Sequence, residues 1–404
     1  MKLILIRYMF QITVLAISLL KIAYAVSRPL FYSGPDANGY MPAALAFAEL
    51  GYLSKEIPFL PIYPPGYPIA LSILIRIFQD NWIYAAQVVQ ILIFALGTIL
   101  VREMLNSYFT KIIGNISAFL LILSPAWFVA NGEAMYETLL FFYISASLYF
   151  FLRGKISSRG TFLNPILGSF FSVLAISTHP RVLIIYVILF LTYIYNSRKA
   201  LKESTMVIWI SICINFLGII LLGYLSVVRT GIFTLSSALW PSMTNNSVLG
   251  GCTDFQCVVL KIFGSPFDFL LESLSNFAAF WSPHSGSLAR GSWFHNISLL
   301  AQLEKYQLTL ISIIIGILFT FIVIGSWVFG TFQLWRTNRN CAFMFTFLTS
   351  LSFLLTDILV YGDNRHRLIA LIFMIPAHGV TTASVIRKYK PKLLRYLRDE
   401  AVIA

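Results

Sequence analysis

Apolar runs long enough to cross a membrane recur from one end of this chain to the other, with no long disordered tail or low-complexity block to interrupt them. A helix that spans a bilayer needs about 20 mainly apolar residues. Backbone polar groups inside a bilayer must be bonded within the protein, so such runs fold as helices. The pattern predicts an all-α polytopic membrane protein with about ten spanning helices, near residues 8–26, 83–102, 112–131, 134–152, 162–178, 181–196, 205–226, 307–330, 341–361 and 368–386.

The composition supports this class. Of the 404 residues, 58% are hydrophobic and only 11% are charged, whereas soluble proteins carry about 25% charged residues. The formal net charge is +13, but the basic residues lie mainly in short loops between the apolar runs. Basic loops of that kind mark the cytoplasmic side of a membrane protein. The charge therefore does not indicate a nucleic-acid-binding role.

Placing the N-terminus in the cytoplasm gives a consistent charge pattern. In that orientation 18 of the 29 basic residues, but only 4 of the 16 acidic ones, face the cytoplasm, as the positive-inside rule requires. The 18 are Lys2, Arg7, Arg102, Lys111, Arg153, Lys155, Arg159, Arg198, Lys199, Lys202, Arg336, Arg339 and six residues of the tail. We predict a single transmembrane domain over residues 1–404 that ends in a basic cytoplasmic tail, residues 387–404.

The N-terminal segment has two interpretations. Lys2 and Arg7, the apolar run and the small residues Ala23-Tyr24-Ala25 resemble a cleavable signal peptide. A retained membrane anchor is favoured, because a spanning helix here keeps the charge pattern consistent.

Two long segments, 27–82 and 227–306, are predicted to face outward. Within the first, residues 39–50 and 66–79 are too short to span comfortably and are predicted to be helices that lie in the membrane interface. The second segment contains Cys252 and Cys257. These cysteines could form a disulfide in an oxidising compartment or remain two separate thiols.

The first candidate site lies in the first outer segment, which reads SGPDANGY over 33–40 and YPPGYP over 63–68. The carboxylate of Asp36 follows the first span closely and could accept a proton from an acceptor hydroxyl. Alternatively, Asp36 or Asn38 could cap the following helix, and the spacing alone favours the cap. The proline-rich interface turn contributes the last three candidates, Tyr63, Pro65 and Tyr67.

The second candidate site is the acidic turn within residues 124–138. Glu133 and Glu137 are four residues apart, so they share a face if the helix begins early enough. The pair could position an acceptor or bind a divalent cation, since hard cations prefer oxygen ligands. The helix dipole alone explains Glu133, but an acid deeper in a span, such as Glu137, is expensive. No other cofactor or metal pattern is evident.

Arginines on the predicted outer side form the third candidate site. Arg365 and Arg367 precede the last span, and Arg181 follows His179-Pro180. A guanidinium recognises phosphate through its planar set of donors, so these three could bind a lipid phosphate at the interface. The alternative is contact with ordinary lipid head groups.

These places, in this order, resemble the GT-C superfamily of polytopic glycosyltransferases, and most closely its protein O-mannosyltransferase and aminoarabinose-transferase group. The resemblance covers most of the chain through few residues: Asp36, Pro64-Pro65-Gly66-Tyr67-Pro68, Ser124-Pro125 and Arg365. It implies a polyprenyl-phosphate sugar donor, Asp36 as the catalytic base, support from Glu137 or Glu133, and donor-phosphate binding by Arg365.

The chain also departs from that family. The late basic motif, commonly Arg-Tyr in the family, reads Arg365-His366 here. Many members have two adjacent acids in the first loop, whereas this chain has one. The expected domain organisation also lacks a large soluble C-terminal domain and ends in a basic tail. A direct transfer of the protein acceptor from that group is therefore not implied.

The expected function is inverting transfer of a hexosyl or pentosyl group to a glycan, lipid or protein acceptor at the outer or lumenal membrane face. The setting favoured is a bacterial plasma membrane and its envelope glycans rather than the endoplasmic reticulum. The main alternative is a polytopic transporter or flippase for a lipid-linked or small anionic substrate. Transporters often show paired halves and mid-membrane sites. Here no clear repeat appears, and the charges gather near the outer helix ends.

Overall fold

The computed structural model describes residues 2–27, 37–51, 64–124, 130–153, 163–197, 201–230, 262–271, 309–353 and 367–389, together with residues 127, 233 and 260. The described part contains helices and turns and no strand. In chain order its helices are α1 Lys2–Ser27, α2 Ala37–Leu50, α3 Gly66–Phe78, α4 Trp82–Tyr108, α5 Lys111–Ile122, α7 Glu137–Arg153, α8 Leu163–Thr178, α9 Leu183–Ser197, α10 Leu201–Thr230, α16 Thr309–Thr337, α17 Arg339–Phe353 and α18 Arg367–Tyr389.

A helix occurs at each predicted span, and α2 and α3 occur where the two short helices of the first outer segment were predicted. Among the described residues, four stretches are long and apolar enough to cross a membrane: Phe10–Ser27, Gly66–Tyr108, Met206–Val228 and Leu368–Tyr389. The all-helical membrane class is thus supported. The number of ten crossings, and the interfacial position of α2 and α3, stay predictions.

One predicted boundary is wrong. The span expected over 112–131 is interrupted, because α5 ends at Ile122. The backbone N–H of Ser124 turns back to the carbonyl of Leu121 at 3.1 Å. Pro125 follows, and the residue before a proline is disfavoured in helical conformation. The sequence signal for the helix end was therefore present in the Ser124-Pro125 pair.

Several helices expose large apolar side chains, as expected of surfaces that contact lipid. On α10, Trp209, Phe216, Leu217 and Leu221 are each about three-fifths exposed. A water-soluble protein rarely leaves a continuous apolar surface of this kind uncovered. The exposed face of α10 is therefore best assigned to the bilayer.

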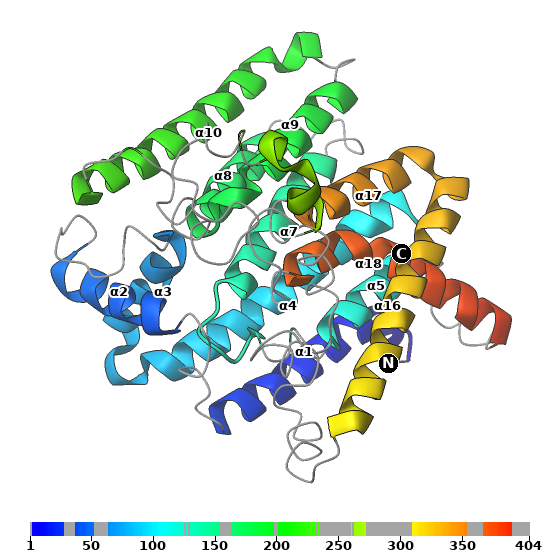
Figure 1. Cartoon of the computed structure of the whole chain (residues 1–404). Helices are drawn as coiled ribbons and strands as arrows, with labels where there is room; N and C mark the ends of the chain where they lie inside the picture. Colours follow the sequence, from blue (N-terminus) through cyan, green and yellow to red (C-terminus); the bar gives the residue numbers. More distant parts are fainter. Residues whose placement is uncertain are drawn as a thin grey trace. The chain divides into compact units, whose positions relative to one another are not determined.

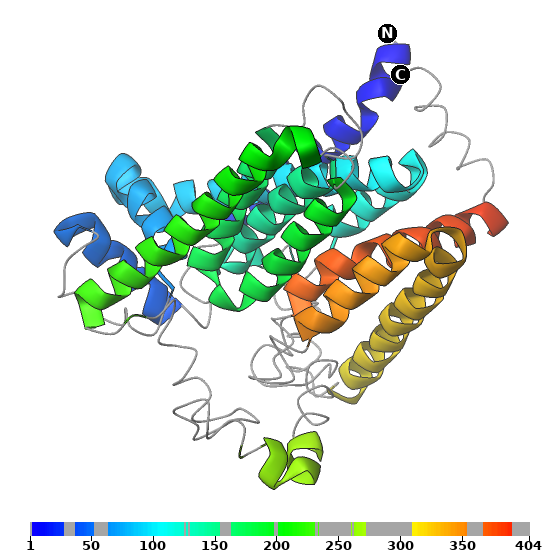
Figure 2. The same cartoon turned by 90° about the horizontal axis from the view of Figure 1, so that it is seen from above.

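The chain divides into two compact units: unit 1 comprises Met1–Leu20, Val101–Val129 and Ser265–Ala404, and unit 2 comprises Lys21–Leu100 and Ala130–Gly264. In unit 1, helix α18 packs against α5, α16 and α17, and Figure 2 shows α16, α17 and α18 side by side. In unit 2, α8 packs against α7, α9 and α10, and α2 packs against α3, as Figure 1 shows.

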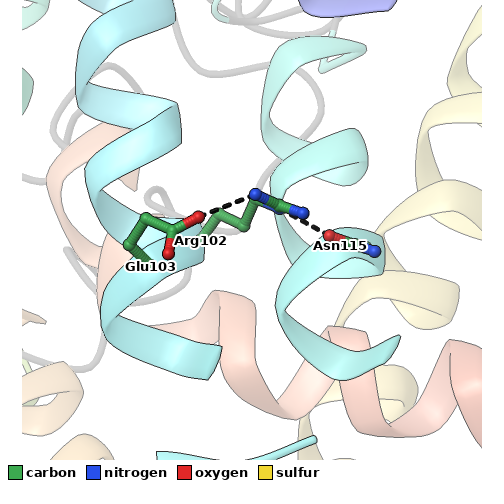
Figure 3. A network of polar contacts seen from close by, with 3 residues as sticks. All are labelled: Arg102, Glu103 and Asn115. Atoms are coloured by element: carbon green, nitrogen blue, oxygen red, sulfur yellow. Dashed lines mark hydrogen bonds and ion pairs between the residues drawn. The ribbon is translucent and has the colours of Figure 1, made fainter. Parts of the chain in front are cut away.

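An arginine joins three helices of unit 1. The Nε of Arg102 on α4 donates to Asn115 Oδ1 on α5 at 2.5 Å, and its Nη1 lies 2.7 Å from the Glu103 carboxylate (Figure 3). Its guanidinium also lies 4.2 Å from the centroid of the Phe10 ring on α1. Arg102 belongs to the predicted cytoplasmic set, and its contacts also hold these helices together.

Glycine allows close packing of α16 on α18. A Cβ placed on Gly330 would collide with the carbonyl oxygen of Ala377, whereas one placed on Gly325 of the same helix meets nothing within 4 Å. Gly330→Ala is therefore expected to lower the free energy of unfolding by about 1–3 kcal/mol through overpacking. Gly325→Ala should be neutral or slightly stabilising, because alanine is the better helix former.

Thermal or denaturant unfolding of the two variants in the same detergent measures this difference. Equal stability of the two variants would contradict the close α16–α18 contact.

Candidate functional site

The acidic turn, residues 131–136, is held in unit 2 by two glutamines of α4. Gln90 Nε2 donates to the backbone carbonyls of Asn131 at 3.1 Å and Glu133 at 2.9 Å. Gln87 Nε2 donates to the carbonyl between them, that of Gly132, at 3.0 Å. Three successive carbonyls are thus bonded by side chains three residues apart, which lie on one helix face. We call these contacts the glutamine clamp.

The other side of the turn is fixed by the first turn of α7. Thr138 Oγ1 donates to Asn131 Oδ1 at 2.9 Å and lies 3.2 Å from the carbonyl of Ala130. The N–H of Met135 donates to the carbonyl of Glu133 at 2.8 Å. The turn is consequently bonded from α4 and from α7, and its backbone geometry is well defined.

The two acids of this turn are buried, with Glu133 4% exposed and Glu137 fully buried. The structure corrects one expectation about them. Helix α7 begins at Glu137, so Glu133 lies in the preceding turn and the two do not share a helix face. The carbonyls of residues 131–133 are bonded instead by the glutamine side chains of α4.

The proline-rich turn of the first outer segment meets the clamp directly. The hydroxyl of Tyr67 donates to Gln90 Oε1 at 2.7 Å, and Tyr67 is 2% exposed. Gly66 lies against the end of α8, where an added Cβ would come within 2.5 Å of Ser177 Oγ. Pro65 begins the helix, since its carbonyl accepts from the N–H of Ile69 at 2.9 Å. The Pro65-Gly66-Tyr67 sequence therefore combines a helix start, a close approach and a hydrogen bond.

Aromatic side chains connect the remaining parts. The Tyr40 ring makes edge contacts with Tyr67 and Tyr136, at centroid distances of 5.2 and 5.8 Å. Tyr136 in turn stacks on the His179 ring at 5.2 Å. Such aromatic pairs stabilise by about 0.5–1.5 kcal/mol beyond area burial. The start of α2, the start of α3, the acidic turn and the end of α8 thus meet in one cluster, formed by Tyr40, Tyr67, Gln90, Tyr136 and His179.

A buried lysine lies near this cluster. Lys21 of α1 is 2% exposed, and its Nζ lies 4.6 Å from the centroid of the Phe94 ring. Phe94 is one helical turn beyond Gln90 and packs on Phe141, at 4.8 Å between centroids. Unit 2 therefore holds a buried lysine as well as two buried acids. A charge in a membrane interior is costly unless other groups of the protein stabilise it.

The structure brings together only some of the predicted site residues. Tyr67, Glu133 and Glu137 fall in or beside the cluster. Arg181 lies in the short helical turn η3, Pro180–Val182, directly after His179, and Arg367 is the first residue of α18; the side chains of both lie outside the described part. Asp36, Tyr63, Arg365, Cys252 and Cys257 lie wholly outside the described residues.

Sequence reasoning missed the two glutamines of the clamp. A signal for them was present, because Gln87 and Gln90 lie within an otherwise apolar run of spanning length. Polar side chains inside a span are expensive unless they are bonded. Two of them three residues apart therefore predict a polar partner facing α4. Among the residues that the structure describes, no group of three or more His, Cys, Asp or Glu side chains is arranged to hold a metal ion.

Comparison with known proteins identifies the fold. No family model matches the chain, and none of the curated proteins does. Among solved structures, an oligosaccharyltransferase from Archaeoglobus fulgidus, crystallised with zinc and sulfate, matches with a TM-score of 0.50 and 13% identity over 96% of this chain. ArnT from Cupriavidus metallidurans, bound to undecaprenyl phosphate, matches with a TM-score of 0.42 and 16% identity, covering 93% of this chain and 79% of that one.

The chain spans about half the length of the archaeal oligosaccharyltransferase, 51% of it. At this identity the match speaks for the fold alone. It nevertheless covers nearly all of the present chain, helices of both units included. The predicted resemblance is thereby supported at the level of the fold alone: the chain shares the all-helical fold of this oligosaccharyltransferase.

Proposed function

We propose that this protein is an inverting membrane glycosyltransferase that moves a sugar from a polyprenyl-phosphate donor to an acceptor hydroxyl at the outer or lumenal face. One observation carries the proposal: the aromatic and glutamine contacts of unit 2 bring three predicted places together. These are the first outer segment, the acidic turn and the His179-Pro180-Arg181 segment. The fold of an oligosaccharyltransferase supports the same class.

Asp36 is the proposed general base. It precedes α2 by one residue and Tyr40 by four, and four residues reach at most about 14 Å. Tyr40 contacts both Tyr67 and Tyr136, and the closeness of Asp36 to Tyr40 in the sequence supports a role for it near the acidic turn. A carboxylate at this position can take the proton of an acceptor hydroxyl as its oxygen attacks the anomeric carbon.

The attack occurs on the face opposite the phosphate, so the configuration at the anomeric carbon inverts. The bond from that carbon to the phosphate oxygen breaks, and polyprenyl phosphate leaves with the electron pair. Arg365, with Arg367 or Arg181, is proposed to bind the departing phosphate. Donors aimed at charge that grows in the transition state accelerate the reaction more than uniform binding does.

Glu133 and Glu137 are proposed to position the acceptor or a divalent cation. Carboxylate oxygens suit a hard cation, and the archaeal oligosaccharyltransferase of similar fold was crystallised with zinc. The clamp supports either role, since a defined backbone turn keeps the two carboxyl groups at a constant spacing. A chelator in the transfer assay separates the two roles.

In the test, the purified protein in nanodiscs is given radiolabelled hexoses and pentoses carried on polyprenyl phosphate. In parallel it is given the same sugars carried on nucleoside diphosphates. We expect consumption of a lipid-phosphate donor only, with inversion visible in the anomeric coupling of the product. Consumption of a nucleoside diphosphate sugar would contradict the proposed donor. Movement of an intact donor across the bilayer, without cleavage, would establish the transporter instead.

A further inference from the structure

Unit 1 contains a cavity that the proposed transfer reaction does not use. Its volume is about 320 Å³, within the range of about 300–1,000 Å³ typical of small-molecule sites. Helices α5, α16 and α18 and the turn after α5 line it. Leu121, Trp127 and Ile375 form much of its apolar wall, and none of the described lining residues is charged. A cavity without a charged group does not suit a phosphate or a carboxylate.

The cavity lining includes both buried and exposed residues. Leu121 and Leu371 are 1% and 7% exposed, whereas Leu123 and Ile322 are 61% and 66% exposed. The exposed rim is apolar, which fits an opening toward hydrocarbon rather than toward water. A ligand would therefore enter from the lipid phase and extend inward between the three helices.

The buried part of the lining contains a histidine, a polar residue in a mainly apolar cavity. His378 is 8% exposed, and its Nδ1 lies 2.9 Å from Ser326 Oγ on α16. Its second ring nitrogen, Nε2, is buried without a hydrogen-bond partner among the described residues, as is Ser124 Oγ. A buried polar atom left without a partner costs about 1–3 kcal/mol. A ligand atom that bonds to it would recover that free energy.

We propose that this cavity binds a neutral lipid alcohol: a hydrocarbon chain that lies along the apolar wall, with a hydroxyl group bonded to His378 Nε2. A hydroxyl both donates and accepts, so it fits either tautomer of a histidine whose Nδ1 is already engaged by Ser326. The volume is about ten times the roughly 30 Å³ of a water molecule in the liquid. It therefore accommodates a chain segment of about ten methylene groups, which are of similar size.

The probe is a hexadecanol that carries a mid-chain diazirine, added to the full-length protein in nanodiscs and mapped by mass spectrometry after illumination. We expect labelled peptides from α5, α16 and α18. Unlabelled hexadecanol should compete at about three- to tenfold lower concentration than hexadecane, the effect of one net hydrogen bond. Equal competition by the two would overturn the proposal, and this comparison requires no variant.

Two variants locate the site. Val323→Phe fills the cavity and is expected to abolish labelling, whereas the matched Val328→Phe lies at an exposed position of the same helix, outside the lining, and should label normally. His378→Phe should erase the preference for the alcohol over the alkane. Equal labelling of the two valine variants would overturn the proposal.

A further competitor, dioleoylglycerol, separates two sources of the same chemistry. Competition by it assigns the site to the hydroxyl of a membrane glycerolipid, whereas competition by hexadecanol alone assigns it to a single-chain alcohol.

Discussion

Replacing Asp36 by asparagine is expected to reduce sugar transfer by about 10²–10⁴-fold, the contribution of a positioned general base. Asparagine keeps the size of the side chain and removes the proton acceptor. It also retains the ability to cap α2, because asparagine and aspartate are comparable N-cap residues. The loss of activity should therefore appear without a loss of stability, measured as transfer rate and unfolding temperature on the same preparation.

The matched control is Asp80→Asn. Asp80 is an exposed carboxylate in the short helical turn η2, Gln79–Asn81, between α3 and α4, so the same chemical change is made outside the cluster. Full activity in both variants would assign Asp36 to a cap and remove the base from the proposed mechanism. The donor-class test described above would still stand, because it depends on the wild-type protein alone.

Replacing Gln90 by leucine should have the second largest effect. The change removes the two bonds to the carbonyls of Asn131 and Glu133 and leaves the Tyr67 hydroxyl without its acceptor. These groups are buried, so we expect the free energy of unfolding to fall by about 2–5 kcal/mol. Transfer by the fraction that remains folded should fall by about 10–10²-fold, because a displacement of about 1 Å at a reacting centre costs that much.

Gln11→Leu, at an exposed position of α1, is the matched control and should change neither quantity. The two readouts separate positioning from stability. If the Gln90→Leu protein is less stable but transfers sugar normally once corrected for its folded fraction, the clamp supports the fold and not the site. Retention of both wild-type stability and wild-type activity would contradict the clamp itself.

The helical architecture could be predicted from the sequence because one physical rule dominates it. Apolar runs in a bilayer have few alternatives to a helix. The short helices predicted at residues 39–50 and 66–79 correspond to α2, Ala37–Leu50, and α3, Gly66–Phe78. Boundaries were less accurate. The run over 112–131 looks continuous in hydropathy, and the Ser124-Pro125 pair is the sequence signal for an earlier helix end.

The contacts of the candidate site were harder to predict, because they join residues far apart in the chain. The sequence suggested Tyr67 and the acids of the turn, but not that Gln90 would bond both Tyr67 and the carbonyl of Glu133, 43 residues away. It predicted a shared helix face for Glu133 and Glu137 only if the helix began early enough, and α7 begins at Glu137. Tertiary hydrogen bonds of this kind leave no periodic signal.

The glutamine clamp has a consequence for how such a protein can change over evolutionary time. Gln87 and Gln90 bond main-chain carbonyls of residues 131–133 and no side chain of those residues. The backbone geometry of the turn therefore does not depend on which side chain residue 133 carries. A substitution of the Glu133 side chain alters what the turn presents while the bonds that set its geometry persist. If the turn positions an acceptor as proposed, a scaffold with this division can change its acceptor preference through single mutations, without first losing its fold.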